Sequence, residues 1–191
     1  PINLLIKKIS ILEDEKKNRF LTARQEFLRS LLNNEVDYDK EDLLNKFEYF
    51  QIGLPNESSF KLLLFRIDHF SAYCDKYNYD DRSAQKTAMM NIMSTLCSTH
   101  CKCEAIDSAD DQITLVFNVP NDLPDELHKI VREWIQMIQE SIFRDFEVSV
   151  SAAVSSIGDT VSSISVLYDE ATNASLYRIF YGSQCTVYAE D

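Results

Sequence analysis

Carboxylates follow two predicted strand segments of this 191-residue chain. Asp68 closes a run of mainly apolar residues that reads LLLFRI at 62–67, which is typical of a strand buried on both faces. Asp110 and Asp111 stand at the tip of a predicted hairpin. Carboxylates at the end of a buried strand are where α/β folds commonly place ligand or metal chemistry. Metal or ligand binding near Asp68 is therefore the first function to weigh.

A second group that could do chemistry combines cysteines and a histidine close together in the sequence: Cys97, His100, Cys101 and Cys103. Their types suggest a zinc site, because thiolates and imidazoles are the usual zinc ligands. They straddle a predicted helix end and strand start, however, and no second CxxC or HxxxH follows. We therefore expect reduced, partly buried thiols and no metal. We also expect His128 on the surface, and no serine, histidine and aspartate triad with nucleophile-elbow glycines is present.

Alternating strands and helices are predicted from residue 60 onward to position these groups. A strand from residue 60 precedes a short helix at 69–76, a break at 78–81 and a helix at 83–98. On the last of these helices, the methionines are expected to be adaptable core residues: Met89, Met90 and Met93. Strands are predicted at 102–107, 112–119, 146–154 and 185–188, with helices from 122 and from 162 or 163 to 177. Hairpin strands beside parallel crossovers predict an α/β fold, with a mixed sheet of about five strands and helices packed on its faces.

Residues 1–56 are predicted to form N-terminal linker helices ahead of a main domain at 57–191. The first apolar residues are spaced three, four and three apart, as in the seam of a short coiled coil, at Ile2, Leu5, Ile9 and Leu12. This register breaks after Leu12, and the apolar pattern resumes at Phe20, Phe27, Leu28, Leu31 and Leu32. The segment is either a dimerising signal helix or a plain helix that caps the core, and periodicity alone does not decide between them.

The predicted helix boundaries of this N-terminal region rest on side chains that favour helix ends. Asn33 and Asn34 indicate a helix stop, and Asp39 indicates the N-cap of a second helix at 42–50. Gly53 and Pro55 follow that second helix, so the main domain is expected to begin near residue 58.

The charge balance is strongly acidic, with 19 lysines and arginines against 31 aspartates and glutamates, a formal net charge of −12. Because binding to phosphates requires a basic surface, we expect this chain to make no direct contact with nucleic acid. No signal peptide is visible, and no apolar run approaches the roughly 18–20 residues of a membrane span. The five cysteines lack the spacing of a secreted disulfide framework, which favours a cytoplasmic location. The missing initiator methionine suggests a fragment of a longer protein.

Three motifs resemble the GGDEF family, whose active members are diguanylate cyclases with a nucleotidyl-cyclase-like α/β fold. RIDHFSAYCDKYNYDDRS at 66–83 resembles the family's DIDHFKxxNDxxGHxxGD. ADDQITLVF at 109–117 is similar to GGDEFxLLL, and EATNASLYRIFYG at 170–182 is similar to the family's ADxALYxAKxxG. The resemblance covers nearly all of residues 60–189 and implies the same fold for them. It also implies no catalytic role for His69, since the family commonly has a histidine there.

The resemblance implies a family metal site whose ligands are changed here. Arg66 stands where the family has its first metal-binding aspartate, and Gln112 replaces the glutamate of the signature, while Asp111 keeps a carboxylate. Two-metal phosphoryl transfer requires those charges, and an arginine at a metal position repels the metal. With Ala109-Asp110-Asp111-Gln112-Ile113 in place of GGDEF, we expect no enzymatic activity, no cofactor and no catalytic residue.

The nucleotide contacts implied by the resemblance are also changed. Cys74 and Ser83 correspond to the asparagine and aspartate that read guanine, and Ser71 and Phe180 to lysines that contact phosphate. Ala109 and Asp110 replace two glycines, and an acidic side chain there opposes a polyphosphate. The arginine-containing inhibitory motif expected upstream of the hairpin is absent from the sequence, since that region reads CKCEAID. We expect a vestigial cleft formed by Arg66, Asp68, Cys74, Ser83, Asp110, Asp111 and Gln112, with Asp68 as scaffold rather than ligand.

Arg66 has two interpretations. Its guanidinium could occupy the vacated metal position and pair with Asp111 or Asp110, which would turn a catalytic cleft into a structural ion pair. Alternatively, Arg66 points into solvent at the strand end. Coordinates decide between the two.

A chain that keeps the fold of this family while its metal and nucleotide residues are changed resembles the degenerate GGDEF-like domains of bacterial AraC-type transcriptional regulators. That resemblance implies a regulatory domain that passes a signal from an upstream sensor, in some cases transmembrane, to DNA-binding helices downstream. We expect a homodimer formed through Ile2, Leu5, Ile9 and Leu12, no membrane insertion by this chain, and DNA contact only through a helix-turn-helix region outside it. The alternatives are a nucleotide-binding sensor without turnover and, last, an active diguanylate cyclase.

Overall fold

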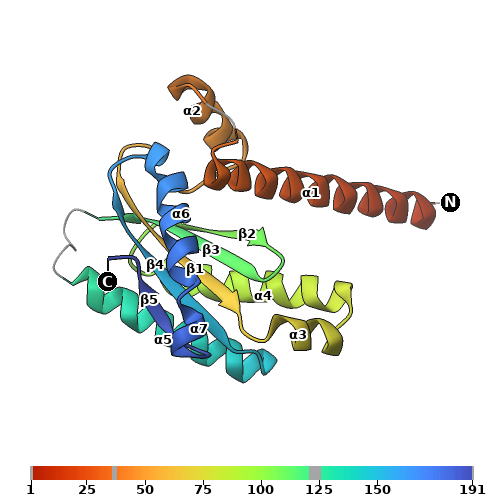
Figure 1. Cartoon of the computed structure of the whole chain (residues 1–191). Helices are drawn as coiled ribbons and strands as arrows, with labels where there is room; N and C mark the ends of the chain where they lie inside the picture. The colour runs from red at the N-terminus through yellow and green to blue at the C-terminus, as the bar shows by residue number, and fades with distance from the viewer. Residues whose placement is uncertain (1, 36–37, 121–125, 191) are drawn as a thin grey trace.

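One five-stranded sheet forms the centre of the molecule (Figure 1). The computed structural model describes residues 2–35, 38–120 and 126–190. The strands are β1 (Ser59–Ile67), β2 (Cys103–Ala109), β3 (Gln112–Val119), β4 (Val150–Gly158) and β5 (Thr186–Tyr188). They lie in the order β2-β3-β1-β4-β5; β4 and β5 pair in parallel and the other neighbours are antiparallel. The predicted α/β fold with a mixed sheet is confirmed.

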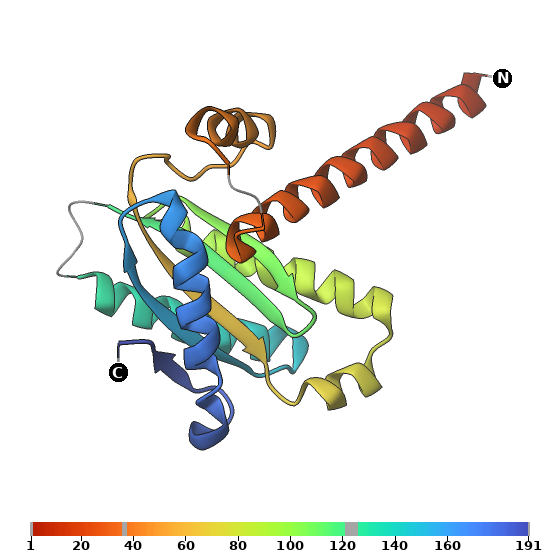
Figure 2. The same ribbon diagram turned by 45° about the horizontal axis from the view of Figure 1, so that its top comes forward.

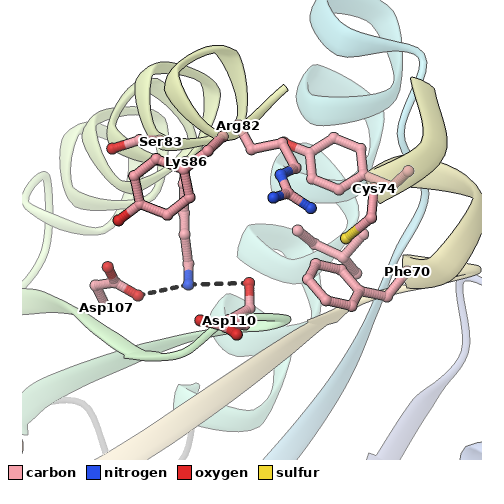
Figure 3. A pocket seen from close by; sticks show the side chains of 10 residues that line it. Phe70, Cys74, Arg82, Ser83, Lys86, Asp107 and Asp110 are labelled. Carbon is pink, nitrogen blue, oxygen red and sulfur yellow. Dashed lines mark hydrogen bonds and ion pairs between the residues drawn. The ribbon is translucent and has the colours of Figure 1, made fainter. Parts of the chain in front are cut away.

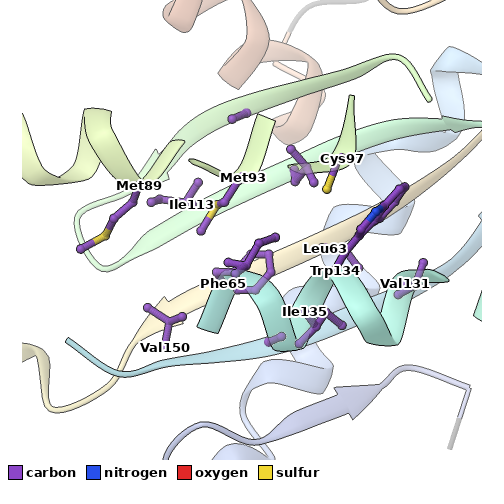
Figure 4. Close-up of a cluster of buried hydrophobic side chains, with 14 of the residues drawn as sticks. Leu63, Phe65, Met89, Met93, Cys97, Ile113, Val131, Trp134, Ile135 and Val150 are labelled. Carbon is purple, nitrogen blue, oxygen red and sulfur yellow. The ribbon is translucent and has the colours of Figure 1, made fainter. Parts of the chain in front are cut away.

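The central strand β1 is buried on both faces, as its apolar run predicts. Successive side chains of a strand point to opposite faces, so one set enters each core. One core lies under α4 (Tyr79–Cys97) and α5 (Leu127–Phe146) and contains Leu63, Phe65, Ile67, Met89 and Met93 (Figure 4). The other lies under α6 (Ile164–Ser175) and contains Phe60, Leu62 and Leu64. The interpretation of Met89 and Met93 as core is confirmed, since both are fully buried.

The N-terminal region consists of two helices, α1 (Ile2–Asn33) and α2 (Lys40–Tyr49). The helix α1 is continuous through Leu12, where the apolar register changes. Its last turns pack into the core that contains Leu62, through Phe27, Leu28 and Leu32. Its first half projects away from the sheet (Figures 1 and 2) and leaves apolar side chains exposed.

The polar signals at the ends of these two helices are confirmed. Asn34, which directly follows α1, has a positive φ of 50°. Such left-handed residues commonly end helices, and asparagine tolerates this conformation better than most residues. Asp39 caps α2, and its side chain accepts a hydrogen bond from the Asp42 amide at 2.8 Å.

Two predicted boundaries are wrong by several residues. Helix α4 begins at Tyr79 rather than residue 83, because the Asn78 side chain accepts a hydrogen bond from the Asp81 amide at 2.9 Å and caps the helix there. Strand β4 begins at Val150 rather than residue 146, because α5 continues to Phe146 and ends where Glu147 takes a left-handed φ of 56°. A side-chain cap at Asn78 and a left-handed residue at Glu147 thus set these two boundaries.

Of the remaining elements, α3 (Phe70–Lys76) lies close to its predicted position, whereas the 3₁₀ turn η1 (Val161–Ser163) and α7 (Arg178–Tyr181) were not predicted. The predicted start of the helix at residue 122 lies outside the described residues. None of the helices in the described part of the chain is both long and apolar enough to cross a membrane.

Candidate functional site

The end of β1 and the β2-β3 hairpin turn meet at one end of the sheet. Arg66 is the register partner of Gln112, and the Ile67 amide donates to the Asp111 carbonyl oxygen at 2.9 Å. The central position of β1, between β3 and β4, therefore places the hairpin turn beside the residues that follow the apolar run.

Arg66 pairs with Asp111. Its Nη1 lies 3.6 Å from Asp111 Oδ2, and the two side chains are 17% and 22% exposed. The predicted contact is therefore present, and the alternative in which Arg66 points into solvent is wrong. The Nε of Arg66 is buried without a hydrogen-bond partner among the described atoms, so the guanidinium is held mainly by charge.

Lys86 is a second cation at the hairpin turn, and the sequence analysis did not identify it. It reaches over from α4, and its ammonium lies 2.5 Å from Asp107 Oδ1 and 3.2 Å from the Asp110 carbonyl oxygen (Figure 3). It also donates to the carbonyl oxygen of Ala109. A lysine is rarely this buried unless it is paired. The sequence spacing could have identified it, because Lys86 lies on the same face of the helix as the core residues Met89, Met93 and Cys97.

Asp68 has protein partners for both of its carboxylate oxygens. Ser151 Oγ donates to Oδ1 at 2.7 Å, and the Gln184 amide donates to Oδ2 at 3.0 Å. Arg178 Nη1 lies 3.6 Å from the same carboxylate and 3.4 Å from the Ile67 carbonyl oxygen. These contacts support the scaffold interpretation, since they join the end of β1 to the C-terminal segment. The sequence analysis did not identify Arg178.

The residues predicted to form one vestigial cleft do not lie in a single site. Cys74, Ser83 and Asp110 line a cavity of about 170 Å³ between α3, α4 and the hairpin, together with Arg82 (Figure 3). Gln112 lies elsewhere, where its side chain accepts a hydrogen bond from Tyr168 of α6 at 3.2 Å. Arg66, Asp68 and Asp111 do not line the cavity either. The cavity is smaller than the roughly 300–1,000 Å³ of typical small-molecule sites.

The cysteines near the start of β2 are unreactive by environment. Burial raises the pKa of the Cys97 thiol, raises that of Cys101 to about 12 and raises that of Cys103 to about 11. Thiols with such pKa values stay protonated at neutral pH and are poor nucleophiles. Across residues 2–35, 38–120 and 126–190, no three His, Cys, Asp or Glu side chains are grouped so as to hold a metal ion.

The remaining histidines have ordinary polar contacts. The His69 Nε2 lies 3.0 Å from Ser183 Oγ, which adds a third link between the end of β1 and the C-terminal segment. His128 lies on the surface as expected, within 2.9 Å of Arg132 Nη2, and stacks on the ring of Tyr188.

Comparison with known proteins supports the fold. No family model matches this sequence, and no curated protein matches it either. The active GGEEF domain of a diguanylate cyclase from Vibrio cholerae superposes with a TM-score of 0.52 at 13% identity, covering 78% of this chain and 90% of that chain. An EAL/GGDEF domain protein from M. capsulatus superposes with a TM-score of 0.50 at 18% identity, covering 71% and 87%. The chain therefore has a GGDEF-like fold, and at these identities the likeness concerns the fold alone.

Proposed function

We propose that this chain is a non-catalytic regulatory domain that relays a signal within a bacterial AraC-type transcriptional regulator. In this proposal, α1 receives the signal from an upstream sensor, which can be transmembrane, and the C-terminal end passes it to DNA-binding helices downstream. The chain itself makes no contact with DNA, in agreement with its formal net charge of −12.

The observation that carries the proposal is the contact of two protein cations with the hairpin turn. Arg66 pairs with the carboxylate of Asp111, and Lys86 contacts backbone oxygens of the same turn. Metal-assisted phosphoryl transfer needs carboxylates that are free to hold cations beside the phosphates. Here the Asp111 carboxylate is paired with Arg66 and the Asp107 carboxylate with Lys86, and Arg66 would repel a metal ion.

The test of this proposal is nucleotide turnover. The purified chain, incubated with GTP and Mg²⁺, is expected to form no cyclic dinucleotide, while an active diguanylate cyclase assayed in parallel provides the positive control. Formation of a cyclic dinucleotide above the background of a reaction without the chain would overturn the non-catalytic assignment.

A nucleotide-binding sensor without turnover is the second candidate, and its site would be the cavity beside Cys74 and Ser83, which at about 170 Å³ is smaller than typical small-molecule sites. The Arg82 guanidinium points into this cavity, between aromatic and sulfur-containing walls (Figure 3). A ligand that binds only the folded state at 100 times its Kd raises the free energy of unfolding by about 2.7 kcal/mol. A pure relay is expected to show no thermal shift with nucleotides, with or without Mg²⁺. A shift that Arg82→Gln abolishes would favour the sensor.

The proposed relay also includes a homodimer formed through the first half of α1. The seam residues are apolar side chains left in solvent, with exposed fractions of 73%, 61%, 48% and 61% for Ile2, Leu5, Ile9 and Leu12. Pairing with the same seam of a second copy would bury these side chains. Changes in the register of that pair would then be the input signal.

A further inference from the structure

The free edge of β2 is covered by a side chain of α1. An edge strand presents unpaired backbone amides and carbonyls, which proteins normally protect. Gln25 Nε2 donates to the Ala105 carbonyl oxygen at 3.2 Å, and Gln25 Oε1 accepts from the Asp107 amide at 3.0 Å. A side-chain amide offers one donor group and one acceptor, as a peptide group does. Gln25 thus occupies the place of the next strand's peptide group.

The neighbouring residue Arg24 fixes α1 at the same position. Its Nη2 lies 2.7 Å from Glu104 Oε2, and its Nε donates to the Phe50 carbonyl oxygen at 3.0 Å. The other oxygen of this buried Glu104 accepts from the Gly53 amide at 2.9 Å. Two consecutive side chains therefore set where α1 sits along β2.

Asp107 connects this contact to the candidate site. Its amide is held by Gln25, and its carboxylate holds the Lys86 ammonium at 2.5 Å. Lys86 in turn donates to the carbonyl oxygens of Ala109 and Asp110 at the turn. The strand has a register shift between Asp107 and Ala109, where the ladder alone leaves the backbone less constrained.

The contacts continue from the turn to the far end of the chain. The Asp111 carbonyl oxygen accepts from the Ile67 amide at 2.9 Å. The next residue, Asp68, holds Arg178 and Gln184. One series of polar contacts therefore runs from α1, through the hairpin turn, to the segment that contains α7 and β5.

We propose that Gln25 acts as a latch: its two hydrogen bonds to Ala105 and Asp107 of β2, when formed, set the conformation of the hairpin turn at residues 109–111. The latch deepens the proposed relay function and rests on it for its biological role. The backbone groups that could bond Gln25 in the same way repeat only every two residues along the strand edge, roughly 7 Å apart. A helix advances only about 1.5 Å per residue, so a small shift of α1 does not reach the next set of groups. A small shift of α1 therefore breaks both hydrogen bonds of Gln25 instead of sliding them. The helix is either seated or released, and this provides the two discrete states that a relay requires.

Amide hydrogen exchange of the whole 191-residue chain, followed residue by residue by NMR, tests the latch. Gln25→Met removes both hydrogen bonds at nearly constant size, and Glu26→Met, an exposed neighbour on the same helix, is the matched control. We expect Gln25→Met to speed exchange about tenfold at Asp107 and also at Ile67, which does not touch Gln25. Exchange in α5 should be unchanged, and Glu26→Met should change neither site.

The outcome at Ile67 decides the matter, because faster exchange at Asp107 alone would show a local contact without transmission and would overturn the latch. If Gln25→Met fails to fold, Gln25→Glu replaces it. That change keeps the acceptor for Asp107 and removes the donor to Ala105, so a smaller increase at Ile67 is expected, and no increase would again overturn the latch.

A double-variant cycle tests the route through Lys86. Lys86→Met should speed exchange at Ile67 by itself, and adding Gln25→Met should then have little further effect. Independent, additive effects would overturn the route. These results are separable from the proposed function: cyclic dinucleotide formation would overturn the relay assignment without affecting the exchange data, and an unaffected Ile67 would remove the latch while leaving an inactive domain.

Discussion

Arg66 and Lys86 place two protein cations against one hairpin turn, 3.6 Å from the Asp111 carboxylate and 3.2 Å from the Asp110 carbonyl oxygen. A cation that is covalently part of the chain is always present, whereas a metal ion must be bound from solution. The turn can therefore be held in one conformation without any ligand. At the residue scale, the presence of side-chain cations where a metal ion would otherwise bind is the strongest physical argument for a structural rather than a catalytic role.

Cys101 provides a pH-dependent prediction at the same scale. Burial raises the pKa of its thiol from 9.0 to about 12 in the folded state. The folded chain thus binds this proton more tightly than the unfolded chain, so the stabilisation is fully present below pH 9 and is lost as the pH rises towards 12. In the parent chain, ionisation of this thiol lowers the free energy of unfolding by at most about 1.4 kcal/mol per pH unit. Cys101→Ala is expected to abolish that decrease.

Urea denaturation at a series of alkaline pH values measures this difference. Only the difference between variant and parent is informative, because other groups also titrate there. Cys103→Ala, at a cysteine whose thiol pKa is raised by burial only to about 11, is the matched control and should remove a decrease that ends at a lower pH. Equal slopes for Cys101→Ala and the parent chain would contradict the prediction.

At the scale of elements, the position of α4 decides where Lys86 can reach. Its N-terminus is set by Asn78, whose side chain accepts from the Asp81 amide at 2.9 Å. A cap of this kind satisfies a backbone amide that has no partner within the helix. The cap starts α4 one turn earlier than the apolar pattern indicates, so Tyr79 and Arg82 become helical and line the cavity.

Asn78→Ala is expected to lower the free energy of unfolding by about 1 kcal/mol, because the Asp81 amide loses its acceptor. Thermal and urea unfolding measure the loss. Asn91→Ala, at an exposed position inside the same helix, should be neutral or slightly stabilising, because alanine is the better helix former. An Asn78→Ala variant as stable as the Asn91→Ala variant would show that the cap contributes nothing.

At the scale of the whole molecule, α1 has two halves with different partners. The second half belongs to the core, through Phe27, Leu28 and Leu32, and holds the edge of β2 through Gln25. The first half is exposed and carries apolar side chains in solvent, among them Leu5 and Ile9. A helix that is packed at one end and free at the other transmits displacement along its length, because its backbone hydrogen bonds make it stiff.

Removal of residues 1–19 tests the dimer without removing the packed half of α1. The full chain is expected to sediment as a dimer and the shortened chain as a monomer, because the exposed seam is deleted. The double variant Leu5→Lys/Ile9→Lys should give the same result, while Ser10→Lys, outside the seam, should leave the dimer intact. Monomers for the unmodified chain would remove the dimer from the proposed function.

Apart from the short η1 and α7, the order and type of the elements from β1 to β5 could be predicted from the sequence, because apolar periodicity is a local property of the chain. The same holds for the burial of both faces of β1 and for the caps at Asn34 and Asp39. The predicted boundaries were wrong where a single polar residue began or ended a helix, at Asn78 for α4 and at Glu147 for α5. The contact between Arg66 and Asp111 was predictable because the likeness of motifs brought the two strand ends together.

Only the tertiary structure decided the partners of the long polar side chains. Gln25 meets β2 from 80 residues away, and Arg178 meets Asp68 across a separation that no local pattern encodes. The same is true of Lys86 at the hairpin turn. Sequence neighbours determine which face of a helix or strand is apolar, and this fixes the layers of the fold. A glutamine, lysine or arginine can satisfy its hydrogen bonds in water or in the protein, so its contacts depend on which backbone groups the packed elements leave without a partner.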